Sequence, residues 1–161
     1  MNPEFPSHPA VLTLVGGLPG AGKSTLSQEI IASRPGVFLC PDQYMADAGI
    51  DLKDASRRGE VNAQMIEQAW SLLAQGESVV LELGLWKKKE RKALRLAARN
   101  MGVSVELHFM NPSLAELQAR LKQRNKIAGG AIGRVSKKEL YTWASEVEYP
   151  SQKELEKFDN F

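Results

Sequence analysis

One stretch of the chain combines the residue types that cradle phosphate groups. Residues 17–24 read G-L-P-G-A-G-K-S and match the phosphate-binding pattern G-x-x-x-x-G-K-S at every fixed position. Its glycines let the backbone turn N–H groups inward around a triphosphate, and a helix starting there points its positive end at the same anion. We expect Lys23 to bridge the β- and γ-phosphates and the Ser24 hydroxyl to ligate Mg²⁺. The predicted nucleotide-binding residues are Gly17, Leu18, Pro19, Gly20, Ala21, Gly22, Lys23, Ser24 and Thr25.

The segments on either side of this loop fit its function. Residues 11–15 are almost continuously apolar and rich in β-branched side chains, which is typical of a buried parallel strand. After the loop, Leu26 and Ile30 have helical spacing. A strand and a helix therefore flank the loop, a context that favours phosphate binding over a merely structural glycine turn.

Two acidic residues follow later strands at the same predicted edge of the sheet. Asp42 comes after the short strand 37–39, where its carboxylate could accept the proton of a hydroxyl that attacks the γ-phosphate. Capping of the next helix is the alternative for this residue. Glu82 follows the apolar run 79–81, the pattern of a carboxylate that holds the water shell of Mg²⁺ opposite Ser24. An acidic residue after a strand is common, so the interpretation of Glu82 as a magnesium-site residue depends on the presence of the phosphate loop.

A third group of candidates is basic. Arg120 and Arg124 lie four residues apart near the predicted end of a helix, and a glycine-rich segment and Arg134 follow. A mobile segment with arginines could exclude water and neutralise charge on a moving phosphoryl group. We therefore predict a lid over about residues 124–136, with an ordinary helix hairpin as the alternative. The stretch 44–60, with the pair Arg57 and Arg58, is predicted to be a second mobile flap.

Strand and helix patterns alternate along the chain and must position these side chains. Strands are expected at 11–15, 37–39, 78–83 and 103–109, and helices at 25–32, 61–73, 87–99 and after Ser113 and Ser136. This order predicts an α/β fold with a parallel sheet covered by helices on both faces. The 161 residues are expected to form a single domain with a loose N-terminal arm at 1–9. The tail beyond Pro150 offers Leu155 and Phe158 as anchors, but its pattern does not place it.

The composition excludes several classes of protein. Hydrophobic residues make up 43% and charged residues 25% of the chain, ordinary values for a soluble protein, and no apolar run is long enough to cross a bilayer. The first residues lack the features of a signal peptide, so we expect a cytoplasmic protein that does not bind membranes. A single cysteine, Cys40, excludes an internal disulfide and a cysteine zinc cluster.

The net charge is only +2, but one helix is strongly basic. Residues 87–99 contain seven basic side chains and one acid, and Arg91, Arg95 and Arg99 share one helical face. A solvated outer face is the simpler interpretation. The alternative is a dock for a phosphorylated or polyanionic substrate.

These motifs together resemble the small P-loop kinases grouped as AAA_33-type ATP-binding proteins, which are related to polynucleotide kinases, zeta toxins and chloramphenicol phosphotransferase. The resemblance runs from about residue 11 to residue 159. It rests on G-L-P-G-A-G-K-S-T at 17–25, C-P-D-Q-Y-M at 40–45, V-V-L-E-L-G-L-W at 79–86, R-L-K-Q-R-N at 120–125 and E-Y-P-S-Q-K-E-L-E-K-F-D at 148–159.

The resemblance implies a three-layer P-loop NTPase fold of the nucleoside-monophosphate-kinase type, with a short parallel sheet and an arginine-bearing lid, and not a ring-forming AAA machine. It implies that Asp42 is the general base or orients the substrate, and that Arg120, Arg124 and Arg134 belong to the lid. Two features depart from the family pattern. Glu82 stands where relatives usually have Asp, and no fifth strand is evident after the lid.

Three functions are compatible with these observations. The first is a kinase that transfers the γ-phosphoryl group of Mg-ATP to a hydroxyl of a small molecule. The second is a 5′-hydroxyl nucleic-acid kinase, which the modest net charge and the lack of aromatic residues within the basic run do not favour. The third is an ATP-controlled switch or ATPase that acts through a protein partner and needs no acceptor pocket beside Asp42. The oligomeric state does not follow from the sequence.

Overall fold

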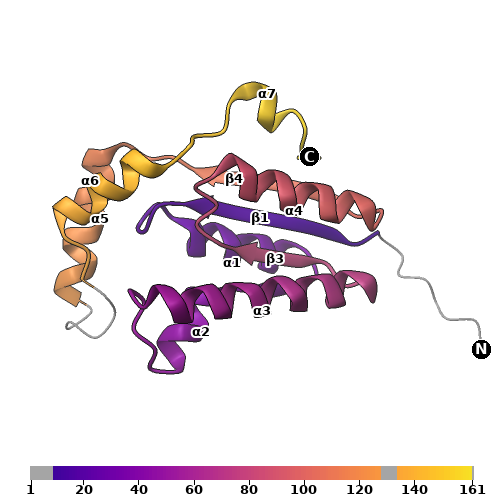
Figure 1. The fold of residues 1–161 in the computed structure, drawn as a ribbon, viewed down its shortest axis with the longest axis horizontal. Coiled ribbons are helices and arrows are strands. Elements are labelled where there is room, and N and C mark those ends of the chain that lie inside the picture. The colour runs from indigo at the N-terminus through magenta and orange to yellow at the C-terminus, as the bar shows by residue number, and fades with distance from the viewer. Residues whose placement is uncertain (1–8, 128–133, 161) are drawn as a thin grey trace, which may run out of the picture.

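The protein, in a computed structural model that describes residues 9–127 and 134–160, is a four-stranded parallel sheet with helices on both faces (Figure 1). The predicted fold class is confirmed. In chain order the elements are β1 (Val11–Gly17), α1 (Lys23–Ser33), β2 (Val37–Leu39), α2 (Pro41–Asp47), α3 (Ala55–Ala74), β3 (Val79–Glu82), α4 (Lys88–Asn100), β4 (Ser104–Met110), α5 (Leu114–Ile127), α6 (Lys137–Glu146) and α7 (Gln152–Leu155).

The strand order in the sheet is β2-β3-β1-β4. Helix α1 lies behind the sheet in Figure 1, and α3 and α4 lie in front of it. The main core forms on that front face, where Leu12, Leu14 and Val105 of the strands pack with Ala69 of α3 and Leu94 of α4. All strands run in the same direction, so their carboxyl ends meet at one edge, where ligands bind in sheets of this kind.

The largest difference from the predicted helices is at the start of α3, which begins at Ala55 and not near Val61. Asp54 caps this helix, because its carboxylate accepts a hydrogen bond from the backbone N–H of Arg57. The cap extends α3 toward α2 and brings its first turn to the edge of the sheet that holds the phosphate loop. The helical spacing of apolar residues begins only in the second turn of α3, so this spacing did not predict the first turn.

The C-terminal segment 148–160 covers α4 and the free edge of β4. Phe158 is buried in the main core and Leu155 packs against it, as the anchors predicted from the sequence. The side chains of Asp159 and Asn160 accept hydrogen bonds from the backbone N–H groups of Val105 and Leu107 at 2.9 Å each. Among the described residues there is no fifth strand, and these side chains provide the pairing that such a strand would supply.

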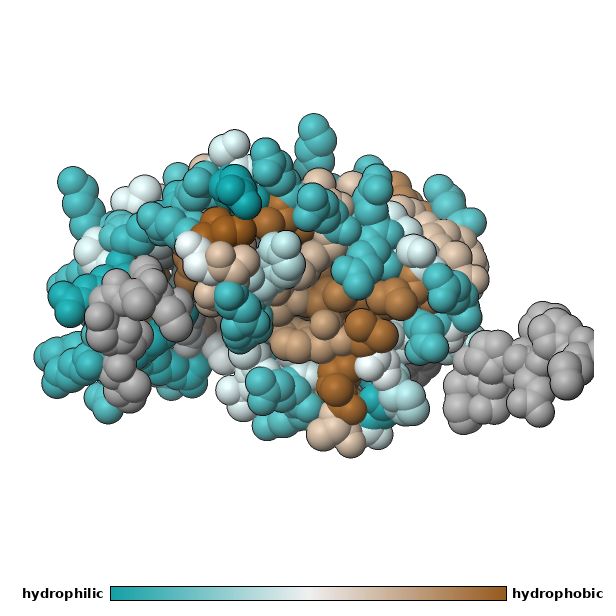
Figure 2. All heavy atoms as spheres, turned by 90° about the horizontal axis from the view of Figure 1, so that it is seen from below, coloured by the Kyte–Doolittle hydropathy of each residue, from teal (hydrophilic) through white to brown (hydrophobic). Residues whose placement is uncertain are grey.

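The opposite edge strand, β2, is short, and its Val37 and Phe38 are only half-buried. Figure 2 looks at the molecule from below and shows apolar side chains gathered across the middle of that side with hydrophilic ones around them. No helix in the described part of the chain is both long and apolar enough to cross a membrane.

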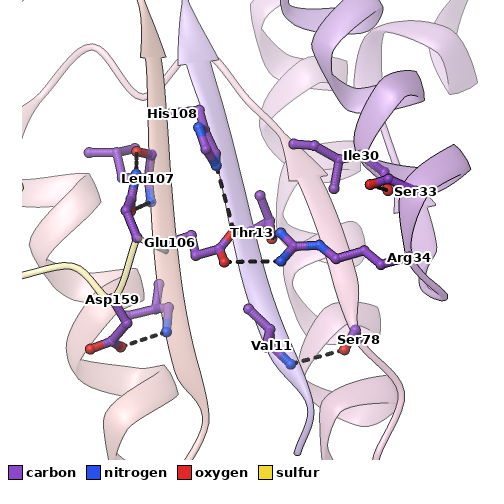
Figure 3. A network of polar contacts seen from close by, with 12 residues as sticks. Val11, Thr13, Ile30, Ser33, Arg34, Ser78, Glu106, Leu107, His108 and Asp159 are labelled. Carbon is purple, nitrogen blue, oxygen red and sulfur yellow. Dashed lines mark hydrogen bonds and ion pairs between the residues drawn. The ribbon is translucent and has the colours of Figure 1, made fainter. Parts of the chain in front are cut away.

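An ion pair between a half-exposed arginine and a buried carboxylate joins the end of α1 to the sheet (Figure 3). Arg34 donates to both carboxylate oxygens of Glu106 on β4, at 3.0 and 2.5 Å, and Thr13 of β1 donates to the same carboxylate at 3.2 Å. Burial alone would raise the pKa of Glu106, but the hydrogen bonds and charge of Arg34, with Thr13 and His108, hold it below its ordinary value. The pair ties the central strand, its neighbour and the helix after the phosphate loop together.

Candidate active site

The phosphate loop has the backbone geometry that its glycines permit. Gly17, Gly20 and Gly22 have φ angles of +138°, +79° and +99°, values that strain any other residue. A Cβ on Gly17 would also lie 2.7 Å from the carbonyl oxygen of Met110. Gly22 immediately precedes α1, so the loop leads directly into the N-terminus of an 11-residue helix.

Lys23 is the first residue of α1 and lies at the floor of the site. Its Nζ donates a hydrogen bond to the carbonyl oxygen of Gly17 at 2.9 Å. Burial lowers the pKa of the ammonium, and the neighbouring carboxylates of Asp42 and Glu82 oppose this effect. The cation is thus held beneath the loop that would enclose the phosphates.

The two residues predicted to bind Mg²⁺ lie in direct contact. The Ser24 hydroxyl donates to Oε1 of Glu82 at 2.9 Å, and Ser27 contacts Oε2 of the same carboxylate at 3.2 Å. Glu82 is buried and Ser27 has no exposed surface. Hydroxyl and carboxylate oxygens are the ligands that Mg²⁺ prefers, and this ion usually takes one or two protein ligands together with substrate phosphates. The donor set fits Mg²⁺, and the extra methylene of Glu82 does not prevent it from reaching Ser24.

Asp42 lies in the first turn of α2 and does not cap that helix. The N-cap residue is Cys40, which makes no side-chain capping bond. The Asp42 carboxylate is ion-paired with Arg58 of α3, whose guanidinium also donates to the carbonyl oxygen of Leu52 through Nε and Nη2. The structure therefore shows a carboxylate whose orientation is set by a neighbouring arginine.

One cavity of about 800 Å³ collects most of the predicted site residues. The phosphate loop, Arg120 and Arg124 of α5, and Asp42 of α2 share this cavity. The cavity is lined by Pro19, Gly20, Ala21, Gly22, Lys23, Ser24, Thr25, Leu26, Glu29, Cys40, Asp42, Gln43, Ala46, Leu52, Glu82, Met110, Asn111, Pro112, Arg120 and Arg124. A nucleotide and a second small molecule both have room in a volume of this size.

Helix α5 brings Arg120 and Arg124 to this cavity by packing on the phosphate loop. Leu121 and Leu117 form a second buried cluster with Leu18 and Ala21 of the loop. Arg120 donates to the carbonyl oxygen of Gly20 at 3.3 Å. Arg134, by contrast, borders a separate cavity between α5 and α6, and its backbone oxygen accepts a bond from Lys53. The glycine-rich part of the predicted lid, 128–133, lies outside the described residues, as do residues 1–8 of the predicted N-terminal arm.

The arginines on the basic face of α4 contact the C-terminal segment. Arg91 is fully buried, Arg95 lies over the ring of Phe158 at 5.7 Å, and Arg99 donates to the backbone of Lys157 and to Asp159. All three arginines are covered by, or bound to, the C-terminal segment. Neither sequence interpretation holds for the buried Arg91, whereas the side chain of Arg99 is 41% exposed.

Some residues of the site escaped the sequence analysis. Arg58 was noted only as part of a flap, and nothing in its spacing relates it to Asp42, which precedes it by 16 positions. Ser27 is three residues beyond Ser24 on α1, so helical spacing could have shown that both hydroxyls face the same side. Met110 ends β4, and Asn111 and Pro112 follow it at the edge where all strands end, a signal that was available.

Comparisons with known proteins agree with this geometry. The chain is similar to a gluconokinase from Sinorhizobium meliloti 1021, with 24% identity over 89% of this chain and 78% of that one and a TM-score of 0.63. A sugar kinase from Janibacter sp. HTCC2649 has 18% identity over 91% and 82% of the two chains, with a TM-score of 0.64. A chain of the Pnkp1/Rnl/Hen1 RNA repair complex has 17% identity over 94% of this chain but 47% of that one, with a TM-score of 0.67.

These likenesses, all below 25% identity, establish the fold. No curated protein matches the sequence significantly. The family described as AAA domain, AAA_33, matches residues 12–150, which is most of the chain. The protein therefore belongs to the AAA_33 family and has the fold of a P-loop kinase.

Proposed function

We propose that the protein is a kinase that transfers the γ-phosphoryl group of Mg-ATP to a hydroxyl of a small-molecule acceptor. The observation that carries this proposal is that one cavity is lined by the phosphate loop with Lys23 and Ser24, by Glu82 and by a further carboxylate, Asp42. A nucleotide switch would need the loop and the residues predicted to hold Mg²⁺, but not a further acidic side chain in the same cavity.

The residues have distinct roles in this reaction. The backbone of residues 17–24 and Lys23 would hold the phosphates, and Ser24 and Glu82 would hold Mg²⁺, which would neutralise phosphate charge. The acceptor oxygen attacks the γ-phosphorus and forms the new P–O bond. The bond to the β,γ-bridging oxygen breaks, ADP leaves, and the hydroxyl proton passes to the carboxylate of Asp42. Arg58 orients that carboxylate, and Arg120 and Arg124 lie where they can stabilise phosphate charge.

A small neutral acceptor fits the described surroundings of Asp42 better than a nucleic acid does. Gln43, Ala46 and Leu52 line the same cavity as Asp42, and Arg58, the arginine in contact with Asp42, is already paired with it. The basic face of α4 that could have served a nucleic acid is occupied by the C-terminal segment. A nucleic-acid kinase therefore remains the second candidate, supported only by the fold shared with the RNA repair chain.

The first experiment is calorimetric titration with Mg-ATP of the wild type and of Lys23→Ala. Lys23→Ala should bind Mg-ATP at least tenfold more weakly, because it removes a charge-assisted contact to phosphate. The variant should still fold, since Lys23 makes its one side-chain bond to the loop itself. Equal affinity in the two proteins would contradict the assignment of the phosphate site.

The second experiment separates a kinase from a switch. The wild type is screened with metabolites, nucleosides, aminoglycosides and oligonucleotides for ATP-dependent phosphorylation, and any acceptor found is tested with Asp42→Asn. Removing the base should lower transfer by roughly 10²- to 10⁴-fold and leave ATP binding intact. Full transfer by the variant would refute the role of Asp42, and the absence of any acceptor would favour the switch.

A further inference from the structure

The first residue of the phosphate loop is held from outside the loop, by the segment that follows β3. The backbone N–H of Gly17 donates to the carbonyl oxygen of Gly84 at 3.0 Å. The carbonyl oxygen of Gly17 accepts the indole N–H of Trp86 at 3.4 Å as well as the Lys23 ammonium. The shape of residues 83–86 therefore sets where the loop begins.

That supporting segment is itself strained. Leu85 has a φ of +56°, and it is the one non-glycine residue with positive φ in the described part of the chain. A left-handed conformation is unfavourable for a residue with a branched side chain, so other contacts must hold Leu85 in place. Its side chain is buried in the main core, and its carbonyl oxygen accepts a hydrogen bond from Nη1 of Arg91 at 2.8 Å.

The C-terminal segment in turn fixes the position of the Arg91 guanidinium. Its Nε and Nη2 donate to the two carboxylate oxygens of Glu154, at 2.6 and 3.0 Å, and Nη2 also donates to the carbonyl oxygen of Glu148 at 2.7 Å. Arg91 has no exposed surface and Glu154 is only 6% exposed. A buried bidentate pair of this kind fixes the guanidinium plane more tightly than a surface contact can.

A second contact ties the same two segments together. The backbone N–H of Glu148 donates to the carbonyl oxygen of Trp86 at 2.8 Å. The chain of contacts thus runs from Glu154 to Arg91, then to the backbone of Leu85 and its neighbours Gly84 and Trp86, and ends on both backbone groups of Gly17. None of these contacts touches the cavity.

We propose that Arg91 and Glu154 are positioning residues that preorganise the phosphate loop through the segment 83–86. The proposal rests on the proposed function of the loop in binding Mg-ATP. Preorganisation lowers the cost of ligand binding, so a change at Glu154, remote from the nucleotide, should weaken nucleotide binding. A purely structural ion pair would lower stability and leave the loop unchanged in the folded protein.

The experiment compares Glu154→Gln with Arg99→Gln, a matched control that also breaks an arginine contact between α4 and the C-terminal segment but does not reach residues 83–86. Two quantities are measured at a temperature at which both proteins are folded. One is the ¹H–¹⁵N resonance of the Gly17 amide and of the Trp86 indole in nucleotide-free protein. The other is the dissociation constant of Mg-ATP.

Glu154→Gln should shift both resonances and weaken Mg-ATP binding by about tenfold or more, whereas Arg99→Gln should leave both resonances in place and the affinity within about twofold. Unshifted resonances and unchanged affinity in Glu154→Gln would overturn the proposal. If that variant does not fold, Glu154→Asp, which keeps the charge but shortens the reach to Arg91, is subject to the same criteria. If the wild type binds no nucleotide, the proposed function fails, and the Gly17 and Trp86 resonances still decide whether Glu154 controls the loop.

Discussion

Helices α4 and α5 both carry arginines four residues apart, and the fold uses them in different ways. On α4, Arg91 and Arg99 bind the C-terminal segment. On α5, Arg120 and Arg124 are exposed and line the cavity beside the phosphate loop. The spacing along each helix is the same, so spacing alone does not show whether an arginine binds a ligand or the protein itself. What packs against each helix decides it.

The comparison predicts that the α4 arginines control stability. Arg91→Met should reduce the free energy of unfolding by about 3–5 kcal/mol, because it leaves the carboxylate of Glu154 buried without its partner. Urea unfolding of the wild type and the variant measures this. The double variant Arg91→Met/Glu154→Met should lose less stability than Arg91→Met alone. A larger loss of stability in the double variant would show that the unpaired carboxylate of Glu154 is not the main cause of the destabilisation.

Arg34 is an intermediate case, an arginine that binds a buried carboxylate at the end of α1. Its partnership holds the pKa of Glu106 below the ordinary value of 4.5. The stabilisation is therefore present above the unfolded pKa and is lost as the pH falls through the lower pKa of the folded state. Glu106→Gln should cost about 1–3 kcal/mol at neutral pH.

Unfolding measured across the acidic range checks this prediction. The difference in stability between wild type and Glu106→Gln should shrink as the pH falls below about 4.5, the ordinary value of this group. A difference that stays constant down to the acid limit of folding would show that the Glu106 charge contributes nothing.

The α5 arginines should affect the ligand and not the fold. Arg120→Ala and Arg124→Ala should each weaken Mg-ATP binding by up to about tenfold, because each removes an exposed charge beside the phosphate loop. Stability should change by less than about 0.5 kcal/mol. Titration calorimetry and urea unfolding on the same samples separate the two effects. Variants that lose stability but keep their affinity for Mg-ATP would show that the α5 arginines, like those of α4, serve the fold and not the ligand.

The smallest effect is expected at Arg99, which shares the α4 face with Arg91 but is exposed. Arg99→Gln should reduce stability by less than about 1 kcal/mol, since Arg99 and Asp159 are 41% and 30% exposed and solvent screens their attraction. Adding salt should reduce that difference further. If Arg99→Gln lost as much stability as Arg91→Met, the exposure of an arginine on α4 would not determine how much it stabilises the protein.

Much of the fold could be predicted because its signals are local. The alternation of apolar runs and helical spacing predicted the four strands and the main helices, and the parallel sheet followed from their order. Lys23 and Ser24 were identified from the phosphate-loop motif, and Asp42 and Glu82 from their positions near the ends of strands. All four line the same cavity. Their roles in catalysis stay predictions.

The features that could not be predicted from the sequence all depend on contacts between segments that are distant along the chain. The partner of Asp42 is Arg58, and the partner of Arg91 is 63 positions away at Glu154. Likewise, the tail pattern gave no strand signal because Asp159 and Asn160 pair with β4 mainly through their side chains. No periodicity along the chain records such pairings.

The sequence by itself determined the phosphate loop and the class of fold, because glycine conformations and strand and helix patterns act over a few neighbouring residues. Only the tertiary structure decided which charged groups face the cavity and which form ion pairs and hydrogen bonds within the protein. The physical reason is burial. A charge removed from water must find a partner, and which partner is within reach depends on how α4, α5 and the C-terminal segment pack together.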